Sequence, residues 1–382
     1  MKNMTMILNR RKFSITTGAA MLAGFNIARA QSEGKIILGQ SAAFTGPAAQ
    51  LGIQFYKGAK VYFDQVNAQG GVGKRLIEIR NLDDGYEPDR CAENTRKLIA
   101  DDVFALFGYI GTPTSVVALP QAIKAKVPFI APFTGAMALR DPFNKYAFHV
   151  RASYNDETAL IVKQLTNLGL KKIAVFYQND AYGKAGLDGV TLALTGLGLK
   201  PVAQATVERN SVDVANAVKT LVAAGPDAVI QISAYKSCAA FIREAKKSGY
   251  GGTYYNVSFV GTQALADELG KEGAGVVVSQ VMPSPYNAAR PIAREFVEAV
   301  KAAGKDAQAN FSSMEGYVAA KLFVEGLRRA GAKANRESLI TGLESIGSQS
   351  LGGFLVSFSP SDHVASHFVE LSMLTGDGRI RT

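Results

Sequence analysis

Three short stretches place hydroxyl side chains and glycine directly after an apolar run. They read AFTGPAAQLG (residues 43–52), GYIGTPTSVV (108–117) and PFTGAMAL (132–139). Each apolar run is typical of a buried strand, and the residues after it are typical of a helix start. Free N–H groups at a helix start, beside a hydroxyl and a glycine that allows close approach, bind small anions such as carboxylates. A plain helix cap is the more ordinary explanation of any one stretch, but three of them on one sheet edge strengthen the case for a carboxylate site.

The elements that carry these stretches alternate between strand and helix. Apolar runs recur that are typical of strands covered on both faces, and helical segments separate them, so the sequence predicts an α/β chain with at least one doubly wound parallel sheet. The predicted strands are residues 35–44, 76–84, 103–109, 127–133, 172–180, 201–208, 227–234, 253–260 and 274–283.

The last hundred residues depart from this alternation. The predicted elements there are helices at 291–304, 312–331 and 335–347, followed by strands at 352–360 and 366–374. This tail is too short for a third α/β domain, so it is expected to complete two domains already begun. The chain would then cross between the domains more than once, which suits a hinge.

The second half of the chain carries tyrosines where the first half carries threonine. Tyr182 and Tyr235 follow predicted strands, and Ser258 precedes FVGTQAL, which repeats Phe, Gly, Ala and Leu of FTGAMAL at the same offsets. The repeat indicates two similar domains in tandem. Tyrosines at loop ends suit the wall of a cleft that closes on an apolar body, although ordinary packing explains each one singly.

The amino terminus has the pattern of an export signal. A twin-arginine sequence, NRRKFS at residues 9–14, is followed by a short apolar region and by ARA at 28–30, which predicts cleavage after Ala30. The sequence leaves open whether export uses the twin-arginine or the general secretory route. Without the five basic residues of this leader, 37 basic residues face 32 acidic ones, a net charge of +5. Because the basic residues are not clustered, nucleic acid is not expected as a partner.

The remaining composition argues for two domains and against catalysis. About 350 residues exceed what one core usually supports. Cys91 and Cys238 lie in different halves and are expected to be buried free thiols. No phosphate-binding loop, dinucleotide fingerprint or nucleophile elbow is present, so no nucleotide cofactor and no enzyme activity are expected. His363 and His367 have a spacing that could bind a metal on a helix, but their segment is predicted as a strand, so no metal site is expected.

Taken together, the export signal, the GP loop, the NAQGGVGKRLIEI turn (67–79) and DAYGKAG (180–186) resemble the type I periplasmic substrate-binding proteins of ABC transporters, in particular the leucine/isoleucine/valine-binding branch. The resemblance covers the whole mature chain. It implies two doubly wound α/β lobes joined by a three-crossover hinge, with residues 31–151 and 286–360 in one lobe and 152–285 and 361–382 in the other. It also implies a periplasmic location, a monomer, and an ABC permease of the inner membrane as the partner.

The resemblance also implies ligand contacts at particular positions. Thr112 corresponds to a hydroxyl that holds the ligand carboxylate, and Phe133, Thr134 and Gly135 form a junction that binds the head group. Tyr182 and Tyr317 match aromatic wall positions, Leu51 matches a residue that covers the ligand, and Tyr235 is a further wall candidate.

Two departures from the family pattern affect the expected ligand. Gly135 stands where relatives have threonine, with Thr134 one place earlier, and Ser258 stands where relatives have the acid that pairs with the ligand ammonium. Either Asp156 or Glu315 replaces that acid, or the ligand is a carboxylate without an α-amine, since a buried ammonium without a counter-charge is costly.

The sequence therefore predicts an extracytoplasmic solute-binding protein of an ABC importer. The ligand would be an amino acid, or an aromatic or branched carboxylic acid, held between two lobes. A periplasmic sensor module that reports ligand to a membrane receptor is the alternative of a different class. A secreted hydrolase is opposed by the missing nucleophile elbow and the scarcity of histidine.

Overall fold

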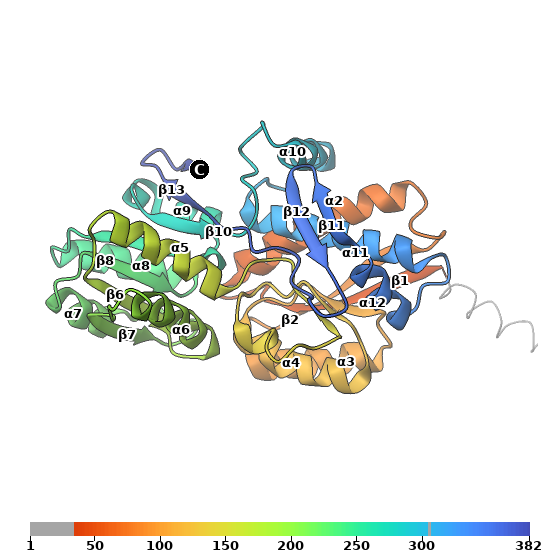
Figure 1. The fold of residues 1–382 in the computed structure, drawn as a ribbon, viewed down its shortest axis with the longest axis horizontal. Helices are drawn as coiled ribbons and strands as arrows, with labels where there is room; N and C mark the ends of the chain where they lie inside the picture. The colour runs from red at the N-terminus through yellow and green to blue at the C-terminus, as the bar shows by residue number, and fades with distance from the viewer. Residues whose placement is uncertain (1–33, 305–306) are drawn as a thin grey trace, which may run out of the picture.

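The computed structural model describes residues 34–304 and 307–382 and shows two lobes side by side (Figure 1). The predicted export signal and its cleavage site lie outside the described residues. Within the described ranges, no helix is long and apolar enough to cross a membrane.

The first lobe is built on a five-stranded sheet in the order β2-β1-β3-β4-β5, and every neighbouring pair is parallel. Continuous apolar runs form its central strands because helices cover both faces, α3 and α4 on one side and α2 and α11 on the other (Figure 1). The strands are β1 (Lys35–Ala42), β2 (Leu76–Asp83), β3 (Ala105–Phe107), β4 (Phe129–Ile130) and β5 (Ala147–Phe148).

Helices from both ends of the chain complete this lobe. On α11, Gly316 lies so close to α2 that a Cβ there would come within 2.0 Å of the Phe55 carbonyl oxygen, so the two helices cross backbone to backbone. A small hairpin of β11 and β12 packs beside them. The elements are α2 (Ala49–Ala68), α3 (Pro88–Ala100), α4 (Thr112–Ala125), α10 (Pro291–Ala303), α11 (Phe311–Ala330), α12 (Arg336–Glu344), β11 (Gly347–Leu351) and β12 (Phe354–Phe358).

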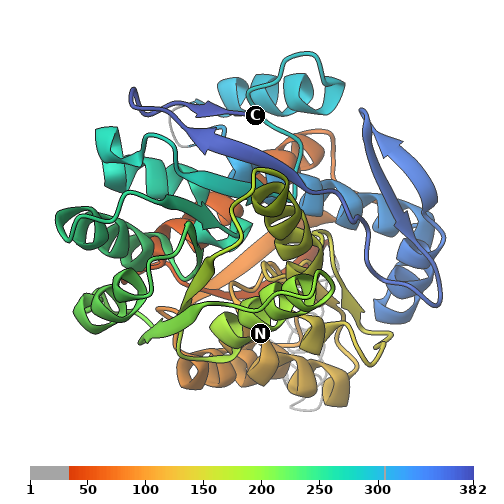
Figure 2. The same ribbon diagram turned by 60° about the vertical axis from the view of Figure 1, so that its left-hand side comes forward.

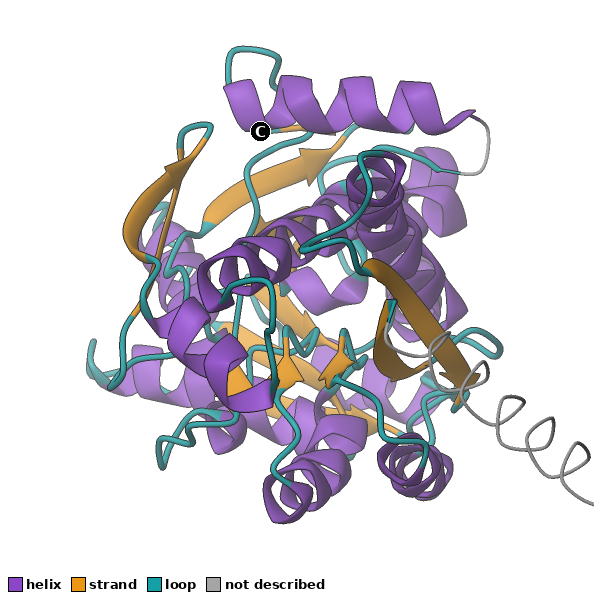
Figure 3. Cartoon of the chain, turned by 90° about the vertical axis from the view of Figure 1, so that its right-hand side faces the viewer, coloured by secondary structure: helices purple, strands orange, loops and turns teal. Residues whose placement is uncertain are grey.

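The second lobe is built on a seven-stranded sheet in the order β14-β13-β10-β9-β8-β6-β7. Strands β6 to β10 are parallel, whereas β13 and β14 join antiparallel at one edge. Helices lie outside the strands (Figure 3). The elements are α5 (Tyr154–Asn167), β6 (Ile173–Gln178), α6 (Ala181–Thr195), β7 (Ala203–Val207), α7 (Ala215–Ala223), β8 (Ala228–Ile232), α8 (Tyr235–Lys247), β9 (Thr253–Asn256), α9 (Thr262–Leu269), β10 (Val277–Gln280), β13 (Glu370–Leu374) and β14 (Ile380–Arg381).

The chain crosses between the lobes three times, after β5, after β10 and after β12. The third crossing is visible in Figure 2, where the blue segment runs from the hairpin to β13 in the other sheet. Two crossings are joined by backbone hydrogen bonds of 2.8 Å, from His149 N–H to His363 O and from Ala365 N–H to His149 O. The predicted lobe boundaries fall within or next to these linkers and stay a prediction.

Most sequence-predicted elements are present, with shorter bounds. The α/β class with parallel sheets is confirmed, and Cys91 and Cys238 are buried free thiols as expected. The predicted strand 253–260 ends at Asn256, because Ser258–Val260 form a 3-10 turn. Strands β11 and β14 were not predicted, since both are short edge strands with little apolar pattern.

Candidate functional site

The second and third of the glycine-threonine stretches lie side by side at the carboxyl ends of β3 and β4. Backbone hydrogen bonds continue past both strands, from Phe133 N–H to Tyr109 O (2.7 Å) and from Gly111 N–H to Phe133 O (3.2 Å). The hydroxyl oxygens of Thr112 and Thr134, both buried, therefore lie 2.6 Å apart. The two loops meet, as a shared binding site requires.

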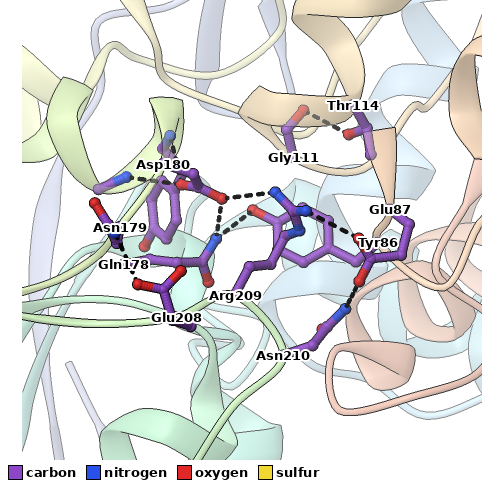
Figure 4. A network of polar contacts seen from close by, with 12 residues as sticks. Tyr86, Glu87, Gly111, Thr114, Gln178, Asn179, Asp180, Glu208, Arg209 and Asn210 are labelled. Carbon is purple, nitrogen blue, oxygen red and sulfur yellow. Dashed lines mark hydrogen bonds and ion pairs between the residues drawn. The ribbon is translucent and has the colours of Figure 1, made fainter. Parts of the chain in front are cut away.

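The start of α4 offers backbone donors at this point. Its N-cap, Gly111, has φ 94, and a Cβ there would lie 2.2 Å from the Tyr86 ring, so only glycine fits. Thr114 turns back along the helix, where its hydroxyl donates to Gly111 O at 3.0 Å (Figure 4). Among the described residues no side chain caps the first turn, so the N–H groups of Thr112 and Thr114 can bind a carboxylate, and the helix dipole favours the negative charge.

The third stretch departs from the predicted helix start. Only a 3-10 turn, Met137–Leu139, follows Thr134 and Gly135, so this loop contributes a hydroxyl and close backbone rather than a helix dipole. A Cβ on Gly135 would lie 2.7 Å from both the ring and the backbone nitrogen of Tyr154. Tyr154 therefore fills the space that a threonine side chain would need, and Thr134 brings the hydroxyl to Thr112 instead.

The first stretch is not available to an external anion. The Asp83 carboxylate accepts hydrogen bonds from the N–H groups of Phe44, Thr45 and Gly85 and from the Thr45 hydroxyl. Although partial burial raises its pKa, these bonds lower the pKa of Asp83 to about 2. The prediction of three equivalent ligand junctions is thus wrong, because one of them already holds a carboxylate of the protein itself.

Aromatic rings from both lobes pack against one another where the lobes meet, and we refer to Tyr86, Phe133, Tyr154, Tyr182 and Phe259 as the aromatic wall. Phe133 lies 5.8 Å from Phe259 between ring centroids, and Phe259 also contacts Tyr86 (5.8 Å) and Tyr182 (4.5 Å). Tyr154 lies 5.4 Å from Tyr182. Phe133 and Phe259 are the matching residues of the internal repeat, so the repeat brings its two phenylalanines together.

The hydroxyl oxygens of Tyr154 and Tyr182 are buried and meet no hydrogen-bond partner among the residues that the structure describes. A buried hydroxyl costs free energy until something satisfies it. This wall therefore combines an apolar surface with two hydroxyl groups that could bind a polar ligand atom.

A buried ion pair borders the aromatic wall. Arg151 donates to both oxygens of Glu315, Nε to Oε1 at 2.8 Å and Nη2 to Oε2 at 2.7 Å, and their side chains are 1% and 4% exposed. Its guanidinium carbon lies 3.9 Å from the Phe133 ring centroid, and Nη1 donates to Ser258 Oγ at 3.1 Å. Because the guanidinium of Arg151 already balances the charge of Glu315, this acid offers no unpaired charge to a ligand ammonium.

Glu157 is the acid nearest to Ser258, and the sequence analysis did not single it out. Its carboxylate accepts from Ser258 N–H (2.7 Å) and Ser258 Oγ (3.0 Å), and from Ser279 Oγ. Complete burial raises the pKa of Glu157, although Arg151 and these hydrogen bonds oppose the rise.

Asp156, the other predicted substitute, caps α5 through Ser153 and lies 3.3 Å from His367, so the structure assigns it to the helix cap.

The remaining predicted residues divide between the cleft and the exterior helices. Leu51 is buried against Gly261 of the other lobe. Tyr235 is buried, and a hydrogen bond with the backbone of Gln50 opposes the rise in its pKa that burial causes. Tyr317 instead packs on Tyr62 and Phe296 and donates to Glu295 at 2.8 Å, so the structure does not bring it to the aromatic wall.

A hollow on the first lobe and the two C-terminal histidines give no support for a further ligand or metal site among the described residues. A hollow of about 1010 Å³ lies at the opposite end of the first sheet, but several of its charged side chains pair within the protein, as in Arg80–Asp101 and Arg336–Asp102, both 2.7 Å. Within residues 34–304 and 307–382, no group of three or more metal-ligating side chains could hold a metal ion. His363 lies 3.2 Å from Glu344 instead.

The fold and the site define a class. Two α/β lobes linked by three crossings, with the threonine loops of the first lobe beside aromatic rings of both lobes, have the architecture of two-lobed proteins that bind small molecules. Residues 35–379 match the periplasmic binding protein family, and the chain belongs to that family. Its members are extracytoplasmic solute-binding proteins of small ligands.

Individual relatives agree with this assignment. A Leu/Ile/Val-binding protein homolog 7 from Brucella suis is 27% identical over 332 residues, covering 81% of this chain and 80% of that protein. A possible leucine/isoleucine/valine-binding protein from Rhodopirellula baltica superposes with a TM-score of 0.86 at 33% identity, covering 90% and 95% of the two chains. A substrate-binding periplasmic protein from Ralstonia solanacearum superposes with a TM-score of 0.85 at 30% identity, covering 91% and 99%. The predicted leucine/isoleucine/valine-binding-like branch is thereby confirmed.

Several residues of this site were missed by the sequence analysis, namely Tyr86, Arg151, Tyr154, Glu157 and Phe259. Two signals were present. Arg151 is a charged residue that follows the apolar run AFHV, and Phe259 is the partner of Phe133 in the internal repeat.

Proposed function

We propose that this protein is the extracytoplasmic solute-binding component of an ABC importer and captures a small carboxylate between its lobes. The observation that supports the proposal most is the pair of hydroxyls on Thr112 and Thr134 at the uncapped start of α4. The ligand carboxylate would accept from these hydroxyls and from helix N–H groups. The protein would then present the closed form to a permease in the inner membrane, without chemical change to the ligand.

The apolar part of the ligand would lie against the aromatic wall. Phe133, Phe259 and Tyr182 supply a flat apolar surface of the kind that binds branched or aromatic groups. Glu157, Glu315 and Asp156 all accept hydrogen bonds from the protein itself. These contacts support a ligand that is a carboxylic acid without an α-ammonium group. An amino acid would need Glu157 as the counter-charge of its ammonium, beside the hydrogen bonds that this carboxylate already accepts from Ser258 and Ser279.

A thermal-shift screen of the chain from Gln31 onward tests the proposal. The compounds are leucine, phenylalanine and their des-amino analogues, 4-methylpentanoic and 3-phenylpropanoic acid, with the matching neutral amides as controls. A compound at 100 times its dissociation constant adds about 2.7 kcal/mol to the free energy of unfolding. We expect the acids to raise the melting temperature and the amides to have no effect. Equal shifts by acids and amides would refute the carboxylate site, and shifts by amino acids alone would point to Glu157 as the ammonium partner.

A further inference from the structure

A polar cluster joins the two lobes beside Tyr86 (Figure 4). From the second lobe, Arg209 Nη2 donates to Glu87 Oε2 at 2.9 Å, and Asn210 Nδ2 donates to Glu87 Oε1 at 2.7 Å and to Gly85 O at 3.0 Å. Gln178 Nε2 lies 3.4 Å from the Tyr86 hydroxyl. Glu87, Arg209 and Asn210 form its centre, and we refer to these three residues as the clasp.

The clasp lies at the edges of the sheets that are farthest from the hinge. Glu87 follows β2, and Arg209 and Asn210 follow β7, and these two strands are the outer edges of their sheets. The crossings leave from β5 and β10 and return to β13, toward the opposite edges. Opening about the hinge therefore moves the clasp residues apart more than residues near the crossings, so contacts here are sensitive to closure.

The second lobe holds its half of the clasp in position. Asp180 caps α6 by accepting from Tyr182 N–H at 2.9 Å, and its other oxygen lies 3.4 Å from Arg209 Nη1. Asn210 has φ 59, a conformation that asparagine tolerates better than most residues. The Arg209 side chain is 24% exposed and the Glu87 side chain 42%, so the interlobe ion pair is only partly screened by solvent.

Arg209 also separates two like charges. Asp180 belongs to the second lobe and Glu87 to the first, and Arg209 contacts both carboxylates. Without the guanidinium, closure would bring these two carboxylates together without a counter-charge, which opposes closure. The closed arrangement thus depends on an ion pair between Glu87 and Arg209, and Asp180 and Gln178 connect this pair to the Tyr86 hydroxyl.

We infer that the clasp sets the population of the closed form, and that it thereby fixes ligand affinity and residence time without contacting the ligand. The inference rests on the proposed function in one respect, that ligand binds between the lobes. The apparent dissociation constant of a ligand that needs the closed form rises in proportion as that form becomes rarer. Loss of the clasp should therefore weaken all ligands by the same factor.

Glu87→Ala tests the inference, because Arg209 keeps its Asp180 contact in this variant. The matched control is Glu208→Ala, which removes a neighbouring carboxylate whose contact, with Asn179 at 2.7 Å, stays within the second lobe. One fluorescent dye on each lobe reports closure in single molecules of the otherwise complete chain without added ligand. We expect a measurable closed fraction in the parent and a smaller one in Glu87→Ala. High salt should lower the closed fraction of the parent but leave that of Glu87→Ala unchanged.

With the two most stabilising acids of the screen, Glu87→Ala should weaken binding by about 5- to 30-fold, mainly through faster dissociation. The ratio of the two dissociation constants should stay constant, and Glu208→Ala should match the parent. The inference would be refuted if the parent had no closed fraction, or if Glu87→Ala had the same closed fraction as the parent. It would also be refuted if the ratio of the two dissociation constants changed, because Glu87 would then contact the ligand. The dye measurement needs no ligand, so it separates failure of the clasp from failure of the carboxylate proposal.

Discussion

The Arg151–Glu315 pair permits a sharp test of how charge is balanced in the cleft. Both side chains are almost completely buried, and both Glu315 oxygens accept from the guanidinium at 2.7–2.8 Å. Glu315→Gln keeps the shape of the side chain but leaves one guanidinium N–H facing an amide N–H. Removing one partner of such a pair costs about 3–5 kcal/mol, because the other charge stays buried without compensation.

This cost is a large part of the total stability, which is about 5–15 kcal/mol for a folded domain. With a urea dependence of about 3 kcal/mol/M, the unfolding midpoint should fall by roughly 1 M or more. The chain contains no tryptophan, so far-ultraviolet circular dichroism is the suitable measurement.

The double variant Arg151→Met, Glu315→Leu supplies the control. It removes both charges of the pair and fills a similar volume, which is often neutral or stabilising, so its midpoint should lie above that of Glu315→Gln, while the loss of Arg151 beside Glu157 keeps it below that of the parent. A Glu315→Gln midpoint equal to that of the parent would refute the reasoning. A double variant less stable than the single one would also refute it, since the defect would then not be an unpaired charge.

Three further outcomes are expected. Thr112→Val should weaken binding of the most stabilising acid by about 1–3 kcal/mol in calorimetric titration, because a hydrogen bond to a charged group is lost; unchanged affinity would remove this hydroxyl from the site. Gly135→Ala should lower the melting temperature, since a Cβ would clash with Tyr154 at 2.7 Å and overpacking costs about 1–3 kcal/mol, whereas Gly251→Ala, with nothing within 4 Å, should not. Burial raises the pKa of Asp84 to about 6, so between about pH 4 and 6 this carboxyl is protonated in the folded state and ionised in the unfolded state. The free energy of unfolding therefore falls by about 3 kcal/mol as the pH rises across that range. In Asp84→Asn, urea titrations across the same range should not show this decline.

The sequence was sufficient for the fold because the fold depends on patterns that persist along the chain. Apolar runs that alternate with amphipathic segments specify parallel strands covered by helices, whatever the details of packing. The stretch GYIGTPTSVV likewise specified its own local structure, since Gly111 at φ 94 and the hydroxyls at the start of α4 are short-range features.

The candidate site was only partly predictable because several of its residues act on partners far away in the chain. Arg151 and Glu315 are 164 positions apart, and Glu157 and Ser258 are 101 apart. Thr45 and Thr112 both stand beside a glycine at the end of a predicted strand, yet Asp83 from the neighbouring strand occupies the junction at Thr45. That occupation depends on a residue 38 positions away from Thr45, which the stretch itself does not contain.

By itself, the sequence determined the fold class, the family resemblance and the loops at which a carboxylate could bind. It could do so because strand periodicity and the residues of a helix start are patterns of a few consecutive residues. The tertiary structure alone decided which of those loops is free, which acid faces Ser258, and that Glu87 meets Arg209 across the cleft. These decisions depend on which side chains the two sheets bring within hydrogen-bond distance, and a buried charge or hydroxyl is costly or functional according to the partner it finds there.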